Sequence, residues 1–289
     1  MTRGELITEL AAALGERHEA RFIVEDVLGP APSPADGHIG ADAVDAAHAM
    51  AARRRAGEPL QYVFGHWAFR ALDLLVDERV LIPRPETEQV VDVALREFGR
   101  SGAVAPRIVD AGTGSGAIAL ALATELADRH PGGHVWATDT SADALTVARA
   151  NLIRATLQCA GAVLPLTFAR GSWLSPLPGE LAGTIDLIVS NPPYVAAAEW
   201  PHLPAEVRRE PIVALVAADG TDGTPGLGDV EDVLSEAWAW LARHGSVVIE
   251  MAPAQAEPAA AMARSLGYRQ VRVETDMAQR PRALVGRRR

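Results

Sequence analysis

The sequence predicts an α/β protein whose core is a mostly parallel sheet with helices on both faces. From about residue 86, strand-like apolar runs alternate with segments of helical periodicity. A glycine-rich turn over 110–116 follows the first of these strands and opens a helix. An acidic residue, Asp139, ends the second strand. This combination is typical of doubly wound sheets, which bind ligands at the carboxyl ends of their strands.

The expected elements of the sheet region follow from hydrophobic periodicity. Runs with strand character occupy 107–109, 134–138, 164–168, 185–190, 246–250 and 268–274. Segments with helical spacing occupy 116–127, 141–155, 228–242 and 254–266. Because strands that alternate with crossover helices pair in parallel, we expect one mostly parallel sheet covered on both faces.

The N-terminal part is expected to form a separate helical unit. Apolar residues recur at helical spacing through 5–57, and the proline-rich segment 29–34 divides them into separate helices. Two runs with strand character, Tyr62-Val63-Phe64 and 72–76, predict a β-hairpin after these helices. We therefore expect three regions: a helical domain over 1–60, a β-hairpin linker over 61–85 and the sheet domain over 86–289.

Composition narrows the class of protein. The chain has 289 residues, 48% of them apolar, and a net charge of −10, which disfavours stable nucleic-acid binding. All 27 basic residues are arginine, which excludes a lysine Schiff base. The single cysteine, Cys159, excludes an internal disulfide and a cysteine-cluster metal site. With no long apolar span and no signal-peptide core, we expect a cytoplasmic monomer without membrane or metal partners.

A glycine-rich loop is the first candidate ligand site. Its residues are Gly112, Thr113, Gly114, Ser115 and Gly116. Glycines there allow tight turning and close approach of the backbone to a ligand. Asp139 has the position at which a carboxylate accepts hydrogen bonds from both hydroxyls of a ribose, although a helix N-cap is its alternative role. Dinucleotides and S-adenosylmethionine both carry that ribose, so the spacing predicts an adenosyl ligand of either kind.

A tryptophan follows the strand expected at 164–168. Trp173 can lie beside an adenine ring, and it can equally be a buried core residue. Both interpretations stay open at this point.

The loop Asn191-Pro192-Pro193-Tyr194, after the strand at 185–190, is the second candidate site. Its prolines fix two φ angles and remove two backbone donors. Such a loop exposes acceptor oxygens that suit a planar NH2 group, whereas a plain turn is the alternative. A dehydrogenase would need a proton-transfer group that this loop lacks. A methyl donor facing a planar nitrogen uses both loops, so we expect methyl transfer to an amide or amine nitrogen.

With these motifs identified, the chain resembles the release-factor glutamine N5-methyltransferases, a family of class I S-adenosylmethionine-dependent enzymes. The resemblance covers almost the whole chain. Its motifs are 53–62, Leu81-Ile82-Pro83-Arg84-Pro85-Glu86-Thr87-Glu88, 110–116, Asp139, 191–194, Arg209-Glu210-Pro211 and Ala214-Leu215. DNA adenine methyltransferases share Asn-Pro-Pro-Tyr but not the Ile-Pro-Arg-Pro block.

The resemblance implies a Rossmann-like fold with seven strands and a role for each motif. It assigns S-adenosyl-L-methionine as cofactor, with S-adenosyl-L-homocysteine as product. The cofactor would contact Gly112, Thr113, Gly114, Ser115, Gly116, Asp139, Trp173 and Asn191. The substrate glutamine would contact Asn191, Pro192, Pro193 and Tyr194. The catalytic groups would be the Asn191 side chain and the Pro192 carbonyl, each accepting one N–H of the amide.

The resemblance also implies a protein partner. Members of the family methylate the glutamine of the Gly-Gly-Gln motif in peptide-chain release factors, and the helical domain over 1–60 would help to recognise them. The chain departs from the family pattern at two glycine positions, which are Ala252 and Gln279 here. These departures affect the expected shape of two loops. Arg84 is expected near the cleft.

Three other functions use similar motifs. A glutamine methyltransferase acting on a ribosomal protein would have almost the same sequence features. A DNA adenine-N6 methyltransferase would use a similar loop, which the charge of −10 disfavours. A non-catalytic adaptor that binds release factors would retain a vestigial pocket, and the intact Asp139 and Asn191 argue against it.

Overall fold

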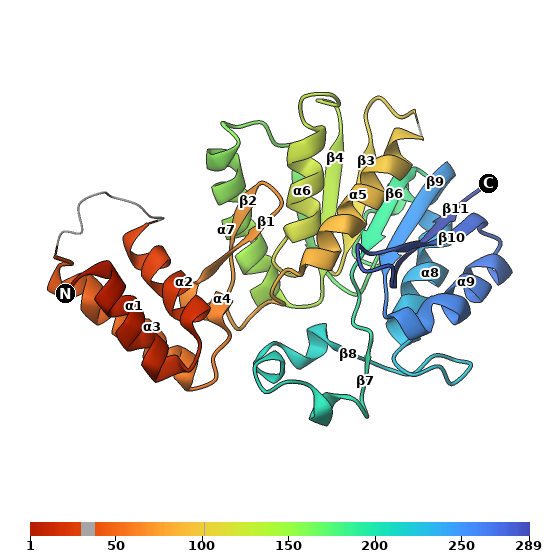
Figure 1. Cartoon of the computed structure of the whole chain (residues 1–289). Helices are drawn as coiled ribbons and strands as arrows, with labels where there is room; N and C mark the ends of the chain where they lie inside the picture. Colours follow the sequence, from red (N-terminus) through yellow and green to blue (C-terminus); the bar gives the residue numbers. More distant parts are fainter. Residues whose placement is uncertain (30–37, 101) are drawn as a thin grey trace. The chain divides into compact units, whose positions relative to one another are not determined.

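Two structural units make up the chain in the computed structural model, which describes residues 1–29, 38–100 and 102–289 (Figure 1). The first unit contains Met1–His66 and Pro204–Arg209. The second contains Trp67–Leu203 and Glu210–Arg289.

The described residues of the first unit form four α-helices around an apolar core of their own. They are α1 (Arg3–Leu14), α2 (Arg17–Leu28), α3 (Ala41–Arg55) and α4 (Leu60–Phe64). Helix α1 begins with a capping box in which Thr2 and Glu5 satisfy each other's backbone N–H groups. The core includes Leu6 and Ile23, which are both 0% exposed. The break expected over 29–34 lies, after Gly29, outside the described residues.

The prediction of a strand over Tyr62-Val63-Phe64 is wrong, because these residues lie in α4. Pro59 precedes the helix with φ −54°, which favours a helical start, and Gly65 ends it with φ +78°. Those two flanking residues outweigh the weak strand propensity of three residues. The hairpin strands are β1 (His66–Phe69) and β2 (Leu72–Leu75), which form a two-stranded sheet.

The second unit contains a seven-stranded sheet with the order β10-β11-β9-β6-β3-β4-β5. Strand β11 is antiparallel to both of its neighbours, and the ladders that join β9, β6, β3, β4 and β5 are parallel. The strands are β3 (Arg107–Ala111), β4 (His134–Asp139), β5 (Leu166–Arg170), β6 (Ile185–Ser190), β9 (Leu241–Glu250), β10 (Arg269–Thr275) and β11 (Pro281–Arg287). This confirms the predicted mostly parallel, Rossmann-like sheet of seven strands.

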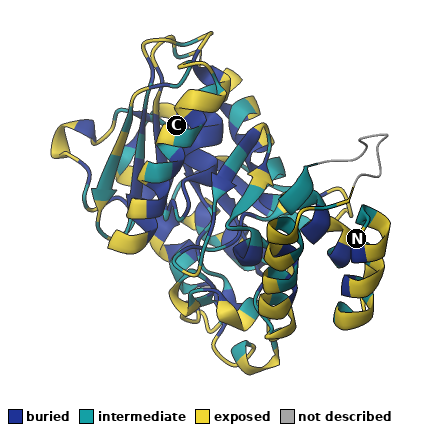
Figure 2. Ribbon diagram, turned by 90° about the vertical axis from the view of Figure 1, so that its left-hand side faces the viewer, coloured by how far each residue is buried: buried dark blue, intermediate teal, exposed yellow. Residues whose placement is uncertain are grey.

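Helices cover both faces of this sheet. One face is covered by α5 (Pro85–Gly99), α6 (Ala117–Leu126) and α7 (Ala142–Gln158). The other face is covered by α8 (Gly228–Trp240) and α9 (Ala256–Ser265). Side chains of successive strand residues point to opposite faces, so Ile108 joins the first core and Val109 the second. The strands between these layers are largely buried (Figure 2).

One strand of the seven-stranded sheet was absent from the sequence prediction. Strand β11 begins with Pro281-Arg282 and has only a short apolar run, 283–285, so its periodicity is weak. It is held by pairing on both sides, with Leu284 opposite Ile249 of β9 and Val273 of β10. Two short strands, β7 (Val195–Ala196) and β8 (Val216–Ala217), form a separate parallel pair between β6 and β9 in the sequence.

Candidate active site

Strand register brings four loop-forming positions together at one edge of the sheet. Ala111 of β3 pairs with Thr138 of β4 and with Ser190 of β6, and Ser190 pairs with Ile249 of β9. The next residues along these strands are Gly112, Asp139, Asn191 and Glu250. From β3 the chain continues to β4 and β5 on one side and then crosses to β6 on the other side of β3, so this edge is the switch point at which doubly wound sheets bind ligands.

The glycine loop has a backbone that side chains would obstruct. Gly112, Gly114 and Gly116 have φ of +78°, +54° and +86°, the left-handed region that favours glycine. A Cβ on Gly112 would lie 3.2 Å from the Trp173 ring. The N–H groups of Gly112 and Thr113 both donate to the Thr138 carbonyl, at 2.9 and 2.8 Å. These bonds hold the loop against the end of β4.

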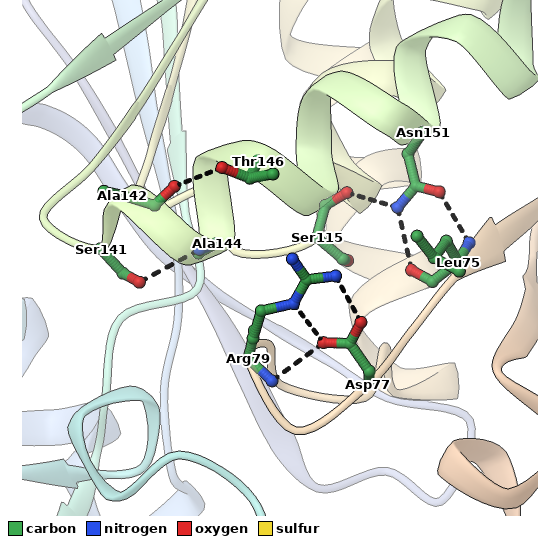
Figure 3. A network of polar contacts seen from close by, with 9 residues as sticks. All are labelled: Leu75, Asp77, Arg79, Ser115, Ser141, Ala142, Ala144, Thr146 and Asn151. Atoms are coloured by element: carbon green, nitrogen blue, oxygen red, sulfur yellow. Dashed lines mark hydrogen bonds and ion pairs between the residues drawn. The ribbon is translucent and has the colours of Figure 1, made fainter.

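A buried asparagine fixes the far side of the same loop (Figure 3). Asn151 of α7 is 0% exposed, and its Nδ2 donates to the carbonyls of Ser115 and Leu75. Its Oδ1 accepts the Leu75 N–H at 2.6 Å. Every polar group of this carboxamide is therefore used in joining the glycine loop to β2.

Asp139 connects the glycine loop to the start of α7. Its Oδ2 accepts the Gly114 N–H and its Oδ1 accepts the Ser141 N–H, both at 2.8 Å. The N-cap of α7 is Ser141, whose hydroxyl accepts the Ala144 N–H, as Figure 3 shows. The alternative role of Asp139 as N-cap is therefore taken by Ser141. Burial raises the pKa of Asp139, while its backbone hydrogen bonds lower it.

A second carboxylate lies beneath the glycine loop. Asp110 is 0% exposed, and its Oδ2 accepts the Thr113 hydroxyl and the Ala119 N–H. Its Oδ1 has no hydrogen-bond partner among the described residues. Burial raises the pKa of Asp110 to about 7. The sequence motif contained Asp110, but the predicted site did not.

Trp173 is half-buried at the rim of the core. It packs against the core between the sheet and α8, and it also lines the cavity described below. Its φ of +42° is unusual for a residue with a side chain. The Thr138 hydroxyl donates to its carbonyl at 2.6 Å, which holds this backbone in place.

A cavity of about 450 Å³ opens at this edge of the sheet, a volume typical of small-molecule sites. The predicted residues that line it are Gly112, Thr113, Gly114, Ser115, Asp139, Trp173, Asn191 and Pro193. Gly116, Pro192 and Tyr194 are not among its lining residues. Further acidic residues, Asp229 and Asp232, also line it, while the lining cations Arg79 and Arg84 are each paired with a carboxylate.

The Asn191–Tyr194 loop is held from below by a buried amide. Gln255, 2% exposed, donates from Nε2 to the carbonyls of Tyr194 and Pro225, both at 3.0 Å. A Cβ on Gly226 would lie 2.5 Å from the Tyr194 carbonyl oxygen, so the loop is tightly enclosed. Among the described residues, no donor reaches the Pro192 carbonyl. The carbonyl that the sequence predicts as an acceptor is therefore not occupied by a described protein donor, although Pro192 is buried and does not line the cavity.

Asn191 itself is half-buried and polarised by its neighbours. Its Nδ2 donates to Thr87 Oγ1 at 3.2 Å, and Thr87 Oγ1 donates to Glu250 Oε2 at 2.7 Å. The Asn191 Oδ1 atom is buried without a hydrogen-bond donor in the described part of the chain. Thr87 and Glu250 were not among the predicted site residues, although Thr87 lies in the quoted motif 81–88 and Glu250 ends the strand expected at 246–250.

The Ile-Pro-Arg-Pro block is held by a buried glutamate. Glu210, 4% exposed, accepts the Ile82 N–H at 3.0 Å and forms an ion pair with Arg84. Pro83 and Arg84 line the cavity, and Pro85 is the first residue of α5. Arg84 therefore lies at the cleft, as expected, but its guanidinium is engaged with Glu210.

The two departures from the family pattern have different structural consequences. Ala252 has φ −68°, which any residue adopts, so glycine is not required there. Gln279 has φ +59°, the left-handed region in which glycine is favoured. Its turn is held by Asp276, whose Oδ1 accepts the N–H groups of Ala278 and Arg280.

Two further observations bear on ligands and surroundings. Among the described residues, no group of three or more His, Cys, Asp or Glu side chains is placed to hold a metal ion. None of the described helices has the length and apolar character needed to cross a membrane.

The sheet order, the glycine loop and the cavity at the switch point define a class I methyltransferase. Residues 93–204 match the family described as Methyltransferase small domain. The catalytic domain of hMettl16 in complex with MAT2A 3'UTR hairpin 1 has the same fold, with a TM-score of 0.52, 15% identity and coverage of 97% of this chain and 90% of that one.

More similar relatives narrow the class to one family. The release factor glutamine methyltransferase of Bordetella pertussis is 38% identical over 281 residues, covering 94% of this chain and 96% of the relative. The release factor glutamine methyltransferase of Moorella thermoacetica is 41% identical over 238 residues, covering 82% of this chain and 77% of the relative. The chain belongs to the release factor glutamine methyltransferases and is an enzyme of methyl transfer. The resemblance stated from the sequence is confirmed.

Proposed function

We propose that this enzyme transfers a methyl group from S-adenosylmethionine to the side-chain nitrogen of the glutamine in the Gly-Gly-Gln motif of peptide-chain release factors, in the cytoplasm. The single observation that carries the proposal is the unpartnered Asn191 Oδ1 atom beside a cavity shared with the glycine loop. Family membership supports the same acceptor, because the relatives are named for glutamine and for release factors.

The cavity residues fit the cofactor. Methyl donation from its sulfonium centre is the chemistry that S-adenosylmethionine supplies when bound. Asp139 is a half-buried carboxylate whose two oxygens offer about four lone-pair sites, so its three backbone donors, Ser141, Gly114 and Thr140, leave room for a hydroxyl proton. Two further acidic residues, Asp229 and Asp232, also line the cavity. Unpaired acidic groups suit a cationic ligand, whereas the cavity's arginines are neutralised by Asp77 and Glu210.

The Asn191 loop fits a primary amide. A glutamine NH2 group has two donors, and the loop provides two acceptors, the Asn191 Oδ1 atom and the Pro192 carbonyl. Two acceptors would fix the plane of the amide and stabilise positive charge that develops on its nitrogen. Holding the nitrogen in one orientation also supplies much of the rate enhancement that a weak nucleophile needs.

The test is methyl transfer to purified release factors. The protein is incubated with methyl-labelled S-adenosylmethionine and a release factor, and the modified residue is located by mass spectrometry. We expect one added methyl group on the Gly-Gly-Gln glutamine, and none on a release factor with Gln replaced by Ala. Methylation of a ribosomal protein or of DNA adenine instead would replace this proposal with the corresponding rival. Cofactor binding without transfer to any of these would favour a non-catalytic adaptor.

A further inference from the structure

A threonine joins the Asn191 amide to a buried carboxylate. Thr87 lies in the first turn of α5, Asn191 follows β6, and Glu250 ends β9. Thr87 is 4% exposed and Glu250 is 0% exposed, so water does not compete for the bonds between them. The distances are 3.2 Å from Asn191 Nδ2 to Thr87 Oγ1 and 2.7 Å from Thr87 Oγ1 to Glu250 Oε2.

The chemistry of these groups gives the chain of bonds a direction. An ionised carboxylate only accepts hydrogen bonds, so the Thr87 hydroxyl must give its one proton to Glu250. The hydroxyl then has only lone pairs to offer Asn191, which must present its NH2 group. The Asn191 oxygen is left free, and it has no donor among the described residues.

We propose that Thr87 and Glu250 are positioning residues that orient the Asn191 carboxamide with its oxygen free to accept the substrate glutamine. This inference rests on the proposed function for the identity of the acceptor. Without the pair, rotation of the carboxamide by half a turn would present an NH2 group to a substrate NH2 group. Two donors would then face each other, and the substrate amide would lose its hold.

The same contacts are poorly explained by stability alone. Glu250 keeps one oxygen, Oε1, buried without a partner in the described part of the structure. Burying a charge with an unsatisfied oxygen costs folding free energy, and a neutral side chain would tie α5 to β9 more favourably. A costly group retained beside a cavity is typical of a functional site.

Replacing Thr87 tests the orientation directly. Thr87→Val keeps the shape and removes the hydroxyl, so kcat should fall about 100-fold, the cost of misplacing a reacting group, while cofactor affinity is unchanged. Thr87→Ser keeps the hydroxyl and should recover most of the lost turnover. The matched control is Thr124→Val, because the Thr124 hydroxyl bonds only carbonyls of its own helix. That control should keep wild-type kcat.

A double-mutant cycle separates positioning from general damage. Since Thr87 acts through Asn191, adding Thr87→Val to Asn191→Ala should reduce turnover little further. Full additivity of the two losses would overturn the proposal. Equal losses in Thr87→Val and Thr87→Ser would also overturn it, because the hydroxyl would then be irrelevant.

A second variant covers the case in which Thr87→Val does not fold. Glu250→Gln has the same shape, but an amide can both donate and accept, so the direction of the bonds is lost. Burial raises the pKa of Glu250 to about 7, and the nearby Glu86 charge also raises it. The positive charges of Arg282 and Arg84 act in the opposite direction. Tyr194 also interacts with the Glu250 charge. The kcat of the wild-type protein should therefore decrease as the pH is lowered through about 7. This decrease should be absent in Glu250→Gln. The same decrease in the variant would overturn the proposal.

A measurement independent of activity distinguishes failure of this inference from failure of the proposed function. With asparagine labelled by ¹⁵N, the Asn191 side-chain signal is identified by its loss in Asn191→Ala. Its hydrogens should exchange slowly in wild type and Thr87→Ser, and much faster in Thr87→Val. Equal exchange rates of the Asn191 side-chain hydrogens in the wild type, Thr87→Ser and Thr87→Val would overturn the positioning role of Thr87 and Glu250, even if release factors are methylated. Faster exchange in Thr87→Val supports the positioning role even if release factors are not methylated.

Discussion

The two loops of the active site reach their conformations by different means. The glycine loop over 112–116 depends on its own sequence, because three residues with positive φ can only be glycine at low cost. The Asn191–Tyr194 loop is stiff by sequence, yet its orientation depends on remote side chains, Thr87 and Gln255. A ligand loop can thus be recognised from local residues, whereas the chemistry of the second loop is completed only by the fold.

The largest expected effect tests the second loop. Asn191→Ala removes the acceptor for the substrate amide, so turnover should fall by about 10²–10³-fold, as when one electrostatic group of an active site is lost. Because the glycine loop is untouched, cofactor affinity measured by calorimetry should stay near that of wild type. A variant with wild-type turnover would remove Asn191 from the mechanism.

The reciprocal variant tests the first loop. Asp139→Ala removes a half-buried carboxylate that also holds the Gly114 N–H, so cofactor affinity should fall by about 10- to 100-fold, the cost of losing charged hydrogen bonds. Asp143→Ala, an exposed position on α7 with the same charge change, is the matched control and should bind normally. Equal affinity in the two variants would show that Asp139 lies outside the cofactor site.

A pH series measures what the buried Glu250 carboxyl costs in stability. The pKa of Glu250 is about 7 in the folded protein, so the folded state binds this proton more tightly than the unfolded chain does. The free energy of unfolding should therefore fall as pH rises from about 4.5 to 7, by at most about 3 kcal/mol for this group. The buried Asp110 carboxyl also lowers the free energy of unfolding as pH rises, and it does so equally in the wild type and in a Glu250 variant.

The comparison with Glu250→Gln isolates that contribution. Denaturant unfolding at several pH values should show a shallower decline in the variant than in wild type. Parallel declines would mean that Glu250 is not the buried acid responsible.

The smallest expected effect lies away from both loops. Gln279 has positive φ, so Gln279→Gly should stabilise the protein by about 0.5–1 kcal/mol, measured by denaturant unfolding. Ala278→Gly in the same turn is the control, because its φ is not positive and glycine there should destabilise. A loss of stability in Gln279→Gly would show that the turn does not require the left-handed conformation.

The sequence predicted those parts of the site that depend on local residues. The fold was predictable from the alternation of strands and helices, and the first loop from its glycines and the acidic end of β4. Each of these features depends on residues that are close together in the sequence. Thr87 and Glu250 could not be paired in advance because they are separated by 163 residues and meet only where helix α5 packs against β9. Strand β11 was missed for the same reason, as pairing with two neighbours compensates for its weak pattern.

The central claim is that the second loop holds a release-factor glutamine for methylation. Mass spectrometry of a release factor after incubation with wild-type protein and methyl-labelled S-adenosylmethionine tests it most directly. We expect one methyl group on the side-chain nitrogen of the Gly-Gly-Gln glutamine, and its loss with Asn191→Ala. A methyl group on any other residue, or an unmodified release factor despite bound cofactor, would contradict the claim.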